Sequence, residues 1–336
     1  MPGPATTPRV PSRRRILSGM RPTGRLHIGH LVGALENWVG LQEEFENYHL
    51  IADYHALTTS LRTEELYENS IEMVIDWLAA GIDPRGSPVF RQSQVKQHAE
   101  LNLIFGMLIT KARLERNPTL KDQVRDLQIE NLTFGHLGYP VLQAADILLY
   151  KGDVVPVGED QVPHVEITRE IARKFNSEYG EVFPEPEPRL TKFARLPGLN
   201  GDMKMSKSSG NTILISDSPD GIAARMKTAV TDPLKVRRND PGRPEVCLVF
   251  TYHRKFNPGA VPGIESGCRS GALGCVECKL KAAAAISGVL APIREKRAHL
   301  ESHRAEVLEI LDDGERRARG IATETMRQVH AAMGIG

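Results

Sequence analysis

Short apolar strands that alternate with helices constrain the fold of this chain more than any other feature. The first unit is an apolar strand at 16–19, a Pro-Thr-Gly turn at 22–24 and a helix at about 26–41. That helix is expected to bury one face, which consists of Leu31, Leu35, Trp38 and Leu41. Strands that alternate with helices in this way indicate a parallel α/β sheet.

The same alternation continues through the first half of the chain. We expect strands at 48–53, 89–90 and 154–157, and helices at about 63–81, 98–111, 142–149 and 165–175. Thr63 is expected to cap the 63–81 helix, with Glu64 and Glu65 in its first turn, and Gly81 to end it.

A proline-rich stretch at 183–197 breaks the alternation, and the chain beyond it has a different pattern. We expect irregular structure at 233–274, followed by two long helices at about 278–311 and 315–333. The predicted fold is therefore a Rossmann-like parallel α/β domain at 14–211 and a mostly helical domain at 212–336, after a flexible tail at 1–13.

Two histidines flank an Ile-Gly step at the start of the first helix. His27 and His30 can donate hydrogen bonds, and Gly29 leaves the main chain open, as an anion at a helix N-terminus requires. An isolated H-x-G-H could be an accidental turn, but the preceding strand and Pro-Thr-Gly turn favour a phosphate site.

A second tract, 204–208, reads Lys-Met-Ser-Lys-Ser. It could be a solvated surface loop, or it could fold over the same phosphates and neutralise charge that develops during attack at phosphorus. Together the two tracts predict adenylyl transfer from ATP. The sequence has neither a Walker A motif nor a dinucleotide G-x-G-x-x-G, which argues against a P-loop ATPase and a dehydrogenase.

Composition adds few restrictions. No apolar run approaches the ~20 residues that a membrane span needs, and the first 15 residues lack the apolar core of a secretory signal, so a cytoplasmic protein is expected. The formal net charge is only +1, so any contact with nucleic acid must come from a local basic surface.

All four cysteines fall in one short window with the spacing C-x20-C-x6-C-x2-C. Four thiolates suit either tetrahedral zinc or a [4Fe–4S] cluster, while free thiols are the third possibility. Disulfides are not expected in a reducing cytoplasm. The candidate ligands are Cys247, Cys268, Cys275 and Cys278.

The two phosphate tracts resemble the signature motifs of class I aminoacyl-tRNA synthetases. Segments 51–58, 139–150, 156–161 and 166–169 closely resemble the bacterial tryptophanyl-tRNA synthetases. The resemblance runs from about Ile16 to Met333 and is weaker after Lys227. It implies activation of L-tryptophan with ATP and Mg²⁺, transfer to tRNA(Trp), and a homodimer.

The resemblance also implies site residues. Asp146 would receive the indole N–H, because a buried donor without a partner costs about 1–3 kcal/mol. The implied catalytic residues are His27, His30, Lys204 and Lys207. The implied ATP site is Arg21, Thr23, Gly29, Lys121, Gly158, Asp160, Lys204, Met205, Ser206 and Lys207. The implied tryptophan site is Leu17, Gly19, His55, Tyr139, Gln143, Asp146, Val155, Val157 and Gln161.

Three positions depart from the family pattern. Leu17 stands for a usual Phe and Gln143 for a usual Met, and a buried Gln143 amide is expected to change how Asp146 is held. The family usually has two lysines near the leaving phosphates. Here only Lys121 is present, and Gln123 occupies the position of the second lysine. Arg125 or Arg21 is expected to supply the missing charge.

A subset of the bacterial tryptophanyl enzymes has a similar four-cysteine tract that holds an iron–sulfur cluster near the anticodon-binding region. The resemblance therefore implies a [4Fe–4S] cluster, with zinc or no metal as alternatives. Basic residues around this tract could be a solvated surface or could contact RNA phosphates. They are Lys235, Arg237, Arg238, Arg243, Arg254, Lys255 and Arg269.

Three other classes of protein share part of this pattern. A tyrosyl-type synthetase could use the same Asp to accept a phenol hydroxyl. A small-molecule adenylyltransferase also has H-x-G-H at a helix start, but it would not need the 204–208 tract and a long helical domain. A binding or redox-sensing protein would leave the intact phosphate tracts unexplained.

Overall fold

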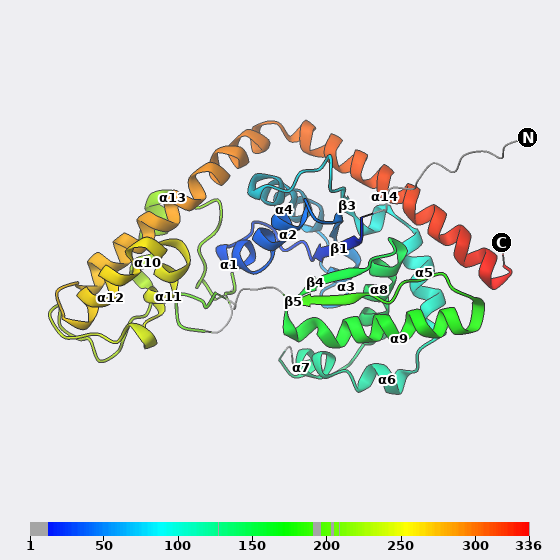
Figure 1. The fold of residues 1–336 in the computed structure, drawn as a ribbon, viewed down its shortest axis with the longest axis horizontal. Coiled ribbons are helices and arrows are strands. Elements are labelled where there is room, and N and C mark those ends of the chain that lie inside the picture. The colour runs from blue at the N-terminus through cyan, green and yellow to red at the C-terminus, as the bar shows by residue number, and fades with distance from the viewer. Residues whose placement is uncertain (1–12, 127, 191–195, 203–204, 208, 336) are drawn as a thin grey trace, which may run out of the picture.

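A five-stranded parallel sheet forms the centre of the molecule, with strand order β3-β2-β1-β4-β5 (Figure 1). The computed structural model describes residues 13–126, 128–190, 196–202, 205–207 and 209–335. The predicted tail at 1–13 thus lies outside the described residues except for its last position. The strands are β1 (Arg15–Met20), β2 (Glu46–Ile51), β3 (Val89–Arg91), β4 (Val154–Val157) and β5 (Glu187–Leu190).

The parallel α/β prediction is confirmed, and four of the five strands were expected. The fifth, β5, lies inside the proline-rich stretch that was predicted to break the alternation, and this expectation was wrong. Pro188 lies within β5. A proline without an N–H is tolerated there because β5 is an edge strand.

Helices surround the sheet in the first half of the chain. The 26–41 prediction corresponds to three consecutive helical segments, with the π-helical η1 (Leu31–Leu35) between α1 (Ile28–His30) and α2 (Glu36–Leu41). Its predicted apolar face is buried. The remaining helices here are α3 (Asp53–Leu57), α4 (Leu66–Ala80), α5 (Gln97–Gly106), α6 (Lys111–Glu115), α7 (Pro118–Asp126), α8 (Phe134–Leu149) and α9 (Val162–Tyr179).

The N-terminal cap predicted for α4 was wrong. This helix begins at Leu66, after Glu65, and Glu65 makes no capping hydrogen bond through its side chain. Thr63 contributes only its main-chain carbonyl, which accepts a 3.0 Å hydrogen bond from Leu66 N. The C-terminal end is as expected, because Gly81 adopts φ +117° there.

The second half is mostly helical, as predicted, but two of its details differ. The segment expected to be irregular contains α11 (Leu248–Phe256) and α12 (Val261–Arg269). The two long helices meet at His303 and not near residue 311–315, so they are α13 (Cys275–Ser302) and α14 (Arg304–Met333). The proline and glycine residues of this segment are why α12 was not predicted. The helix forms nevertheless, because Pro262 lies in its first turn, where a missing N–H costs nothing. These helices are preceded by α10 (Pro219–Thr228).

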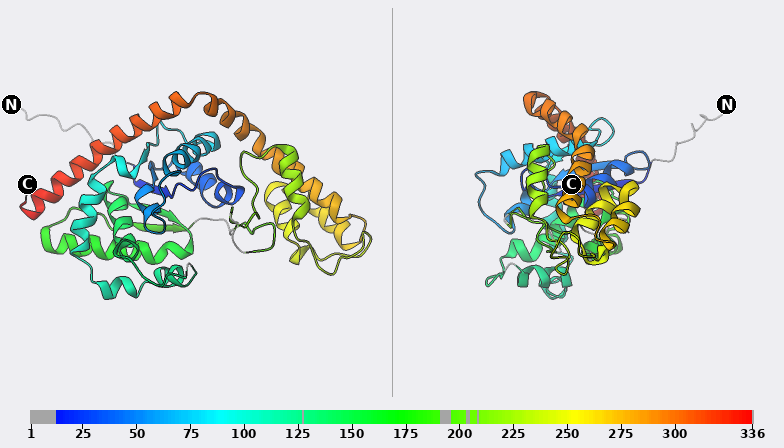
Figure 2. Two further views of the ribbon diagram at one scale, coloured as in Figure 1. Left: turned by 180° about the vertical axis from the view of Figure 1, so that it is seen from behind. Right: turned by 90° about the vertical axis from the view of Figure 1, so that its left-hand side faces the viewer.

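The two long helices bridge the molecule. Figures 1 and 2 show α10–α12 and the start of α13 at one end, with α13 and α14 arching over the α/β part towards the other end. The buried side chains of α14 between Ala318 and Val329 pack into a core shared with α5, α8 and α9. At Gly314 the helix touches β3 so closely that a β-carbon would lie 2.0 Å from Val89 O. The C-terminal helix is therefore fixed on the α/β part.

Candidate active site

The His27–His30 tetrapeptide lies beyond the carboxyl end of β1. His27 precedes α1 with an extended backbone, and its ring centroid lies 3.8 Å from that of His30. The main-chain N–H of His27 donates to His30 Nδ1 at 3.3 Å. Both imidazoles thus face one another at the edge of the sheet where ligands bind in open α/β folds.

The lysine-bearing loop is brought to this tetrapeptide by its own downstream chain. Ile28 N donates to Ile213 O, and Ile215 N donates to Leu26 O, both at 2.9 Å. Lys207 Nζ hydrogen-bonds the main-chain carbonyl of Thr23 in the Pro-Thr-Gly turn. The structure thus joins the two tracts, although they are far apart in sequence. The predicted Lys204 lies outside the described residues.

Met205 connects the two tracts through side-chain packing. It is buried in the core that also contains Ile28 and Leu31. A β-carbon on Gly29 would lie 3.1 Å from Met205 Sδ and 2.9 Å from His27 Nδ1, so only glycine leaves both side chains in place. Ser206 is held from within the loop, because its N–H donates to Asn211 Oδ1 at 2.8 Å.

A cavity of about 410 Å³ lies between β1, β4, α3 and α8 and reaches Gly33 and Ala34, which follow the tetrapeptide in η1. The described residues of the two tracts are not among those that line it. The cavity is lined by all nine residues of the predicted tryptophan site, which are Leu17, Gly19, His55, Tyr139, Gln143, Asp146, Val155, Val157 and Gln161. Arg21 and Gly158 of the predicted ATP site line it as well. The structure thus brings these residues together around one cavity.

Asp146 is the most constrained polar group in this cavity, with 3% exposure. Its carboxylate accepts hydrogen bonds from His55 Nε2 at 2.9 Å, His98 Nδ1 at 2.7 Å and Gln92 Nε2 at 2.7 Å. Burial alone would raise the pKa of Asp146, but the hydrogen bonds and charges of His55 and His98 lower it below its ordinary value. The side chain is therefore an anion held by three donors.

This arrangement corrects one expectation and adds two residues. Gln143 was expected to change how Asp146 is held if its amide is buried. It is half-buried and lines the cavity, but the amide that donates to Asp146 is that of Gln92. Gln92 follows β3, and His98 lies in α5, where its Nε2 contacts Tyr150 Oη at 2.9 Å. Neither has a local sequence motif. The one signal that could have identified His98 is its helical spacing from the apolar Leu101 and Phe105, which places it on the buried face of α5.

Tyr139 is held by a second buried chain of hydrogen bonds. Its hydroxyl contacts His164 Nε2 at 2.7 Å, and Asn117 Nδ2 donates to His164 Nδ1 at 2.8 Å. Thr119 N donates to Asn117 Oδ1, which fixes the orientation of that amide. Burial lowers the pKa of His164 to about 4, so the ring is neutral and its remaining proton lies on Nε2. His164 therefore donates to Tyr139.

The other predicted nucleotide residues are more dispersed. Arg21 lies on the border between the 410 Å³ cavity and another of about 450 Å³ that Thr23 lines. Gly158 lies close to the exposed side chain of Asp160, whose Oδ1 would be 2.8 Å from a β-carbon at position 158. Lys121 and Arg125 lie on the exposed part of α7, where Arg125 pairs with Asp122 and Asp126. Arg21 is thus the better-placed of the two arginines considered for the missing charge.

Known proteins share both the fold and the length of this chain. The family model described as "tRNA synthetases class I (W and Y)" matches residues 11–291. The tryptophan–tRNA ligase of Thermotoga maritima is 49% identical and that of Aquifex aeolicus 44%, each over 96% of this chain and 99% or 100% of the relative. The chain belongs to the bacterial tryptophanyl-tRNA synthetases of class I.

A crystal structure of a related synthetase is similar over nearly its whole length. Tryptophanyl-tRNA synthetase from Campylobacter jejuni, complexed with ADP and tryptophan, superimposes with a TM-score of 0.86 at 37% identity. The match covers 95% of this chain and 99% of that one. The fold of this synthetase, including its C-terminal helices, is therefore that of the family.

The four cysteines of this synthetase line one small cavity at the start of α13. Burial and the neighbouring thiols raise the pKa of Cys278 to about 12, and the pKa of Cys268 is raised for the same reasons. Such mutual repulsion between thiolates is relieved when a cation binds. Within the described residues, however, no three His, Cys, Asp or Glu side chains are arranged around a single metal ion.

The basic residues near the cysteines divide into two groups. Lys235 and Arg243 have partners within the protein. Lys235 hydrogen-bonds the main-chain carbonyl of Asp240, and Arg243 forms an ion pair with Asp232 at 2.6 Å. Lys255 pairs with Glu36 of α2 at 2.5 Å. The exposed ones are Arg237, Arg238, Arg254 and Arg269.

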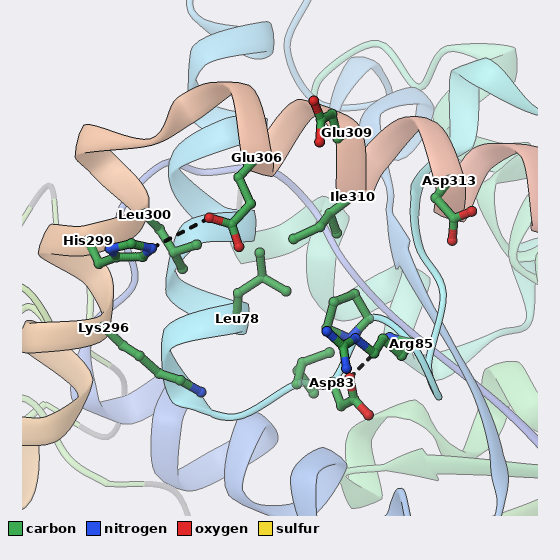
Figure 3. A pocket seen from close by; sticks show the side chains of 12 residues that line it. Leu78, Asp83, Arg85, Lys296, His299, Leu300, Glu306, Glu309, Ile310 and Asp313 are labelled. Carbon is green, nitrogen blue, oxygen red and sulfur yellow. Dashed lines mark hydrogen bonds and ion pairs between the residues drawn. The ribbon is translucent and has the colours of Figure 1, made fainter.

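Another cavity, of about 500 Å³, lies away from these sites at the elbow between α13 and α14. Figure 3 shows Lys296, His299 and Leu300 of α13 and Glu306 and Ile310 of α14 around it. None of the predicted site residues lines it.

In the described part of the chain, no helix has the length and apolar character needed to cross a membrane.

Proposed function

We propose that this synthetase activates L-tryptophan with ATP, forming tryptophanyl-adenylate and pyrophosphate, and then transfers the tryptophanyl group to tRNA(Trp) with release of AMP. The observation that carries this proposal is the cavity around Asp146, which contains the whole predicted tryptophan site and reaches Gly33 and Ala34, after the first of the joined phosphate tracts. The comparisons with tryptophan–tRNA ligases support the same reaction.

In the tryptophan cavity, Asp146 is the acceptor for the indole N–H. Because His55, His98 and Gln92 hold the carboxylate, its oxygens have little freedom to move, and a preorganised acceptor selects a ligand whose donor lies at the right place. Tyr139 and Gln161, which line the same cavity, are proposed to hold the ammonium and carboxylate of tryptophan. The walls of Leu17, Val155 and Val157 exclude water from the ring.

The chemical step requires little acid–base chemistry. The tryptophan carboxylate attacks the α-phosphorus of ATP in line with the leaving pyrophosphate. His27, His30, the main chain at Gly29, Lys204 and Lys207 bind the phosphates and neutralise the charge that develops on the leaving group. Mg²⁺ accompanies ATP on its phosphates and supplies further counter-charge.

Amino-acid-dependent exchange of pyrophosphate into ATP tests this function directly. Exchange with tryptophan at much lower concentration than with tyrosine is expected, followed by charging of tRNA(Trp). Preference for tyrosine would favour the tyrosyl-type alternative. Absence of exchange with every amino acid would refute the synthetase activity.

We further propose that Cys247, Cys268, Cys275 and Cys278 hold a [4Fe–4S] cluster, with zinc as the alternative. Around one zinc ion all four sulfurs lie about 2.3 Å from the same atom, whereas a cluster binds each thiol through a different iron and separates the sulfurs. All four thiols line one small cavity, which supports a metal centre that they share. Iron and acid-labile sulfide in anaerobically purified protein would support the cluster, and zinc alone would overturn it.

The helical region is proposed to bind the transfer RNA. The division into domains at 14–211 and 212–336 fits this role, with α14 packed back on the first domain. Arg237, Arg238 and Arg254 are exposed and are proposed to contact RNA phosphates, whereas the exposed Arg269 is already paired with Glu245 and Glu265. Since aminoacylation in bacteria takes place in the cytoplasm, we propose that location.

A homodimer is also proposed. Large apolar side chains are exposed around α5 and the start of α8, with Leu103 at 64%, Met107 at 74% and Phe134 at 88%. These side chains line a hollow of about 860 Å³, and a second copy would remove this apolar surface from water. Sedimentation should show a dimer that Phe134→Glu dissociates, whereas Val289→Glu on α13 should not.

A further inference from the structure

A buried ion pair joins α13 to α4 below the phosphate tracts. Arg297 of α13 is 2% exposed and Asp76 of α4 is fully buried. Arg297 Nη1 binds Asp76 Oδ1, while Nη2 binds Glu72 and, at 2.8 Å, Glu301. Figure 3 shows the neighbouring Lys296 and Leu300 of α13 around the same cavity as Leu78 of α4, at this elbow.

The second oxygen of Asp76 has a different partner. Asp76 Oδ2 accepts a 2.6 Å hydrogen bond from the main-chain N–H of Leu26, the residue immediately before His27. The carbonyl of Leu26 in turn accepts from Ile215 N, on the strand-like segment that follows the lysine loop. One residue, Leu26, therefore connects Asp76 with both phosphate tracts.

Electrostatics supports the same connection. Burial raises the pKa of Asp76 to about 6, against the opposing effect of Arg297 and the Leu26 N–H, so the carboxylate is charged at neutral pH. Burial lowers the pKa of Lys207, and the negative charge of Asp76 acts in the opposite direction. Asp76 therefore also favours the charged form of Lys207.

We infer that Asp76, held by Arg297, is a positioning residue for the ATP site, and that α13 acts on adenylate formation through this pair. The inference rests on the proposed function. The same helix begins at Cys275 in the cysteine cavity, contains Pro292 and carries Arg297 near its other end. A displacement of α13 at Arg297 would therefore act on Asp76 and, through it, on Leu26.

Asp76→Asn tests the inference, because one amide oxygen cannot serve both Arg297 and the Leu26 N–H. Glu315→Gln is the matched control: Glu315 is also a buried carboxylate, at 3% exposure, and joins Arg91 to α14 at 2.6 Å, but it does not contact the phosphate tracts. In tryptophan-dependent pyrophosphate exchange, Asp76→Asn should lower kcat about tenfold to hundredfold and change KM for tryptophan less than about twofold. Glu315→Gln should leave kcat nearly unchanged at a comparable loss of Tm.

The pair is tested by combining substitutions. If Arg297 acts through Asp76, Arg297→Met with Asp76→Asn should lower kcat no more than either change alone. Additive losses would overturn the inference, as would equal kcat values for Asp76→Asn and Glu315→Gln in an active enzyme. Wild-type protein without exchange would instead refute the proposed function.

Discussion

Gly29 lies directly against Met205, so that a β-carbon on Gly29 would come within 3.1 Å of the methionine sulfur. This contact is where the tetrapeptide and the lysine loop pack together. His27 Nδ1, at 2.9 Å from the same position, adds a second obstacle. Because of these two contacts, any side chain at position 29 would displace His27 or Met205.

Gly29→Ala should slow adenylate formation about tenfold to hundredfold, because His27 and Met205 must both move away from the phosphates. Single-turnover kinetics of adenylate formation would measure it. Gly40→Ala is the control, since a β-carbon there meets nothing within 4 Å. Equal rates for the two variants would contradict the proposed contact.

Lys207→Ala should lower the rate of adenylate formation about hundredfold or more while tryptophan binding changes little. Lys207 Nζ hydrogen-bonds the main-chain carbonyl of Thr23 in the Pro-Thr-Gly turn, which borders the proposed phosphate site. Rapid-quench rates and equilibrium binding of tryptophan separate the two effects. Equal losses in both would remove Lys207 from the catalytic residues.

Asp146→Asn should weaken tryptophan binding and lower the free energy of unfolding at pH 7 by about 1–3 kcal/mol, because an amide cannot accept from all three donors. The pKa of Asp146 is below its ordinary 3.8 in the folded protein, so its stabilisation is present above that value and is lost as the pH falls through the folded-state pKa. Urea titrations of both proteins should therefore converge below about pH 4. A difference independent of pH would contradict an ionised Asp146.

His164→Gln should reduce the acid sensitivity of the fold. The unfolded chain takes up a proton on His164 near its ordinary pKa of 6.5, whereas the folded protein does so only at about 4. The wild type should therefore lose about 3 kcal/mol of stability from this group as the pH falls across that interval. Unfolding free energies from pH 7 to 4 should fall less steeply for the variant. Parallel curves would show that His164 titrates normally.

Gly242→Ala should disturb the cysteine centre, because a β-carbon would lie 2.6 Å from Cys268 Sγ and 3.0 Å from Lys235 Cδ. The expected result is less bound metal per chain in protein purified without oxygen. Gly263→Ala in α12 is the control, since a β-carbon there meets nothing within 4 Å. Unchanged metal content in Gly242→Ala would mean that Cys268 is not a ligand.

Several elements were predictable because their signals are local. Apolar strands beside amphipathic helices indicated the parallel sheet, and His27–His30 with the 204–208 tract indicated a phosphate site. The strand β5 and the helix α12 were missed because proline normally opposes both. Their prolines occupy the tolerated places, an edge strand and a first helical turn, and only the assembled sheet and helix reveal those places.

The sequence by itself determined the chemistry available to this protein: two imidazoles at a helix start, paired lysines in one loop, a carboxylate in an apolar helix and four thiols in one window. Only the tertiary structure decided which groups act together. Gln92 and His98 hold Asp146. Arg297 binds Asp76, which lies 221 positions earlier in the chain, and Asp76 accepts a hydrogen bond from Leu26. Contacts of this kind are set by long-range packing of helices on a sheet, and no local pattern of residues specifies them.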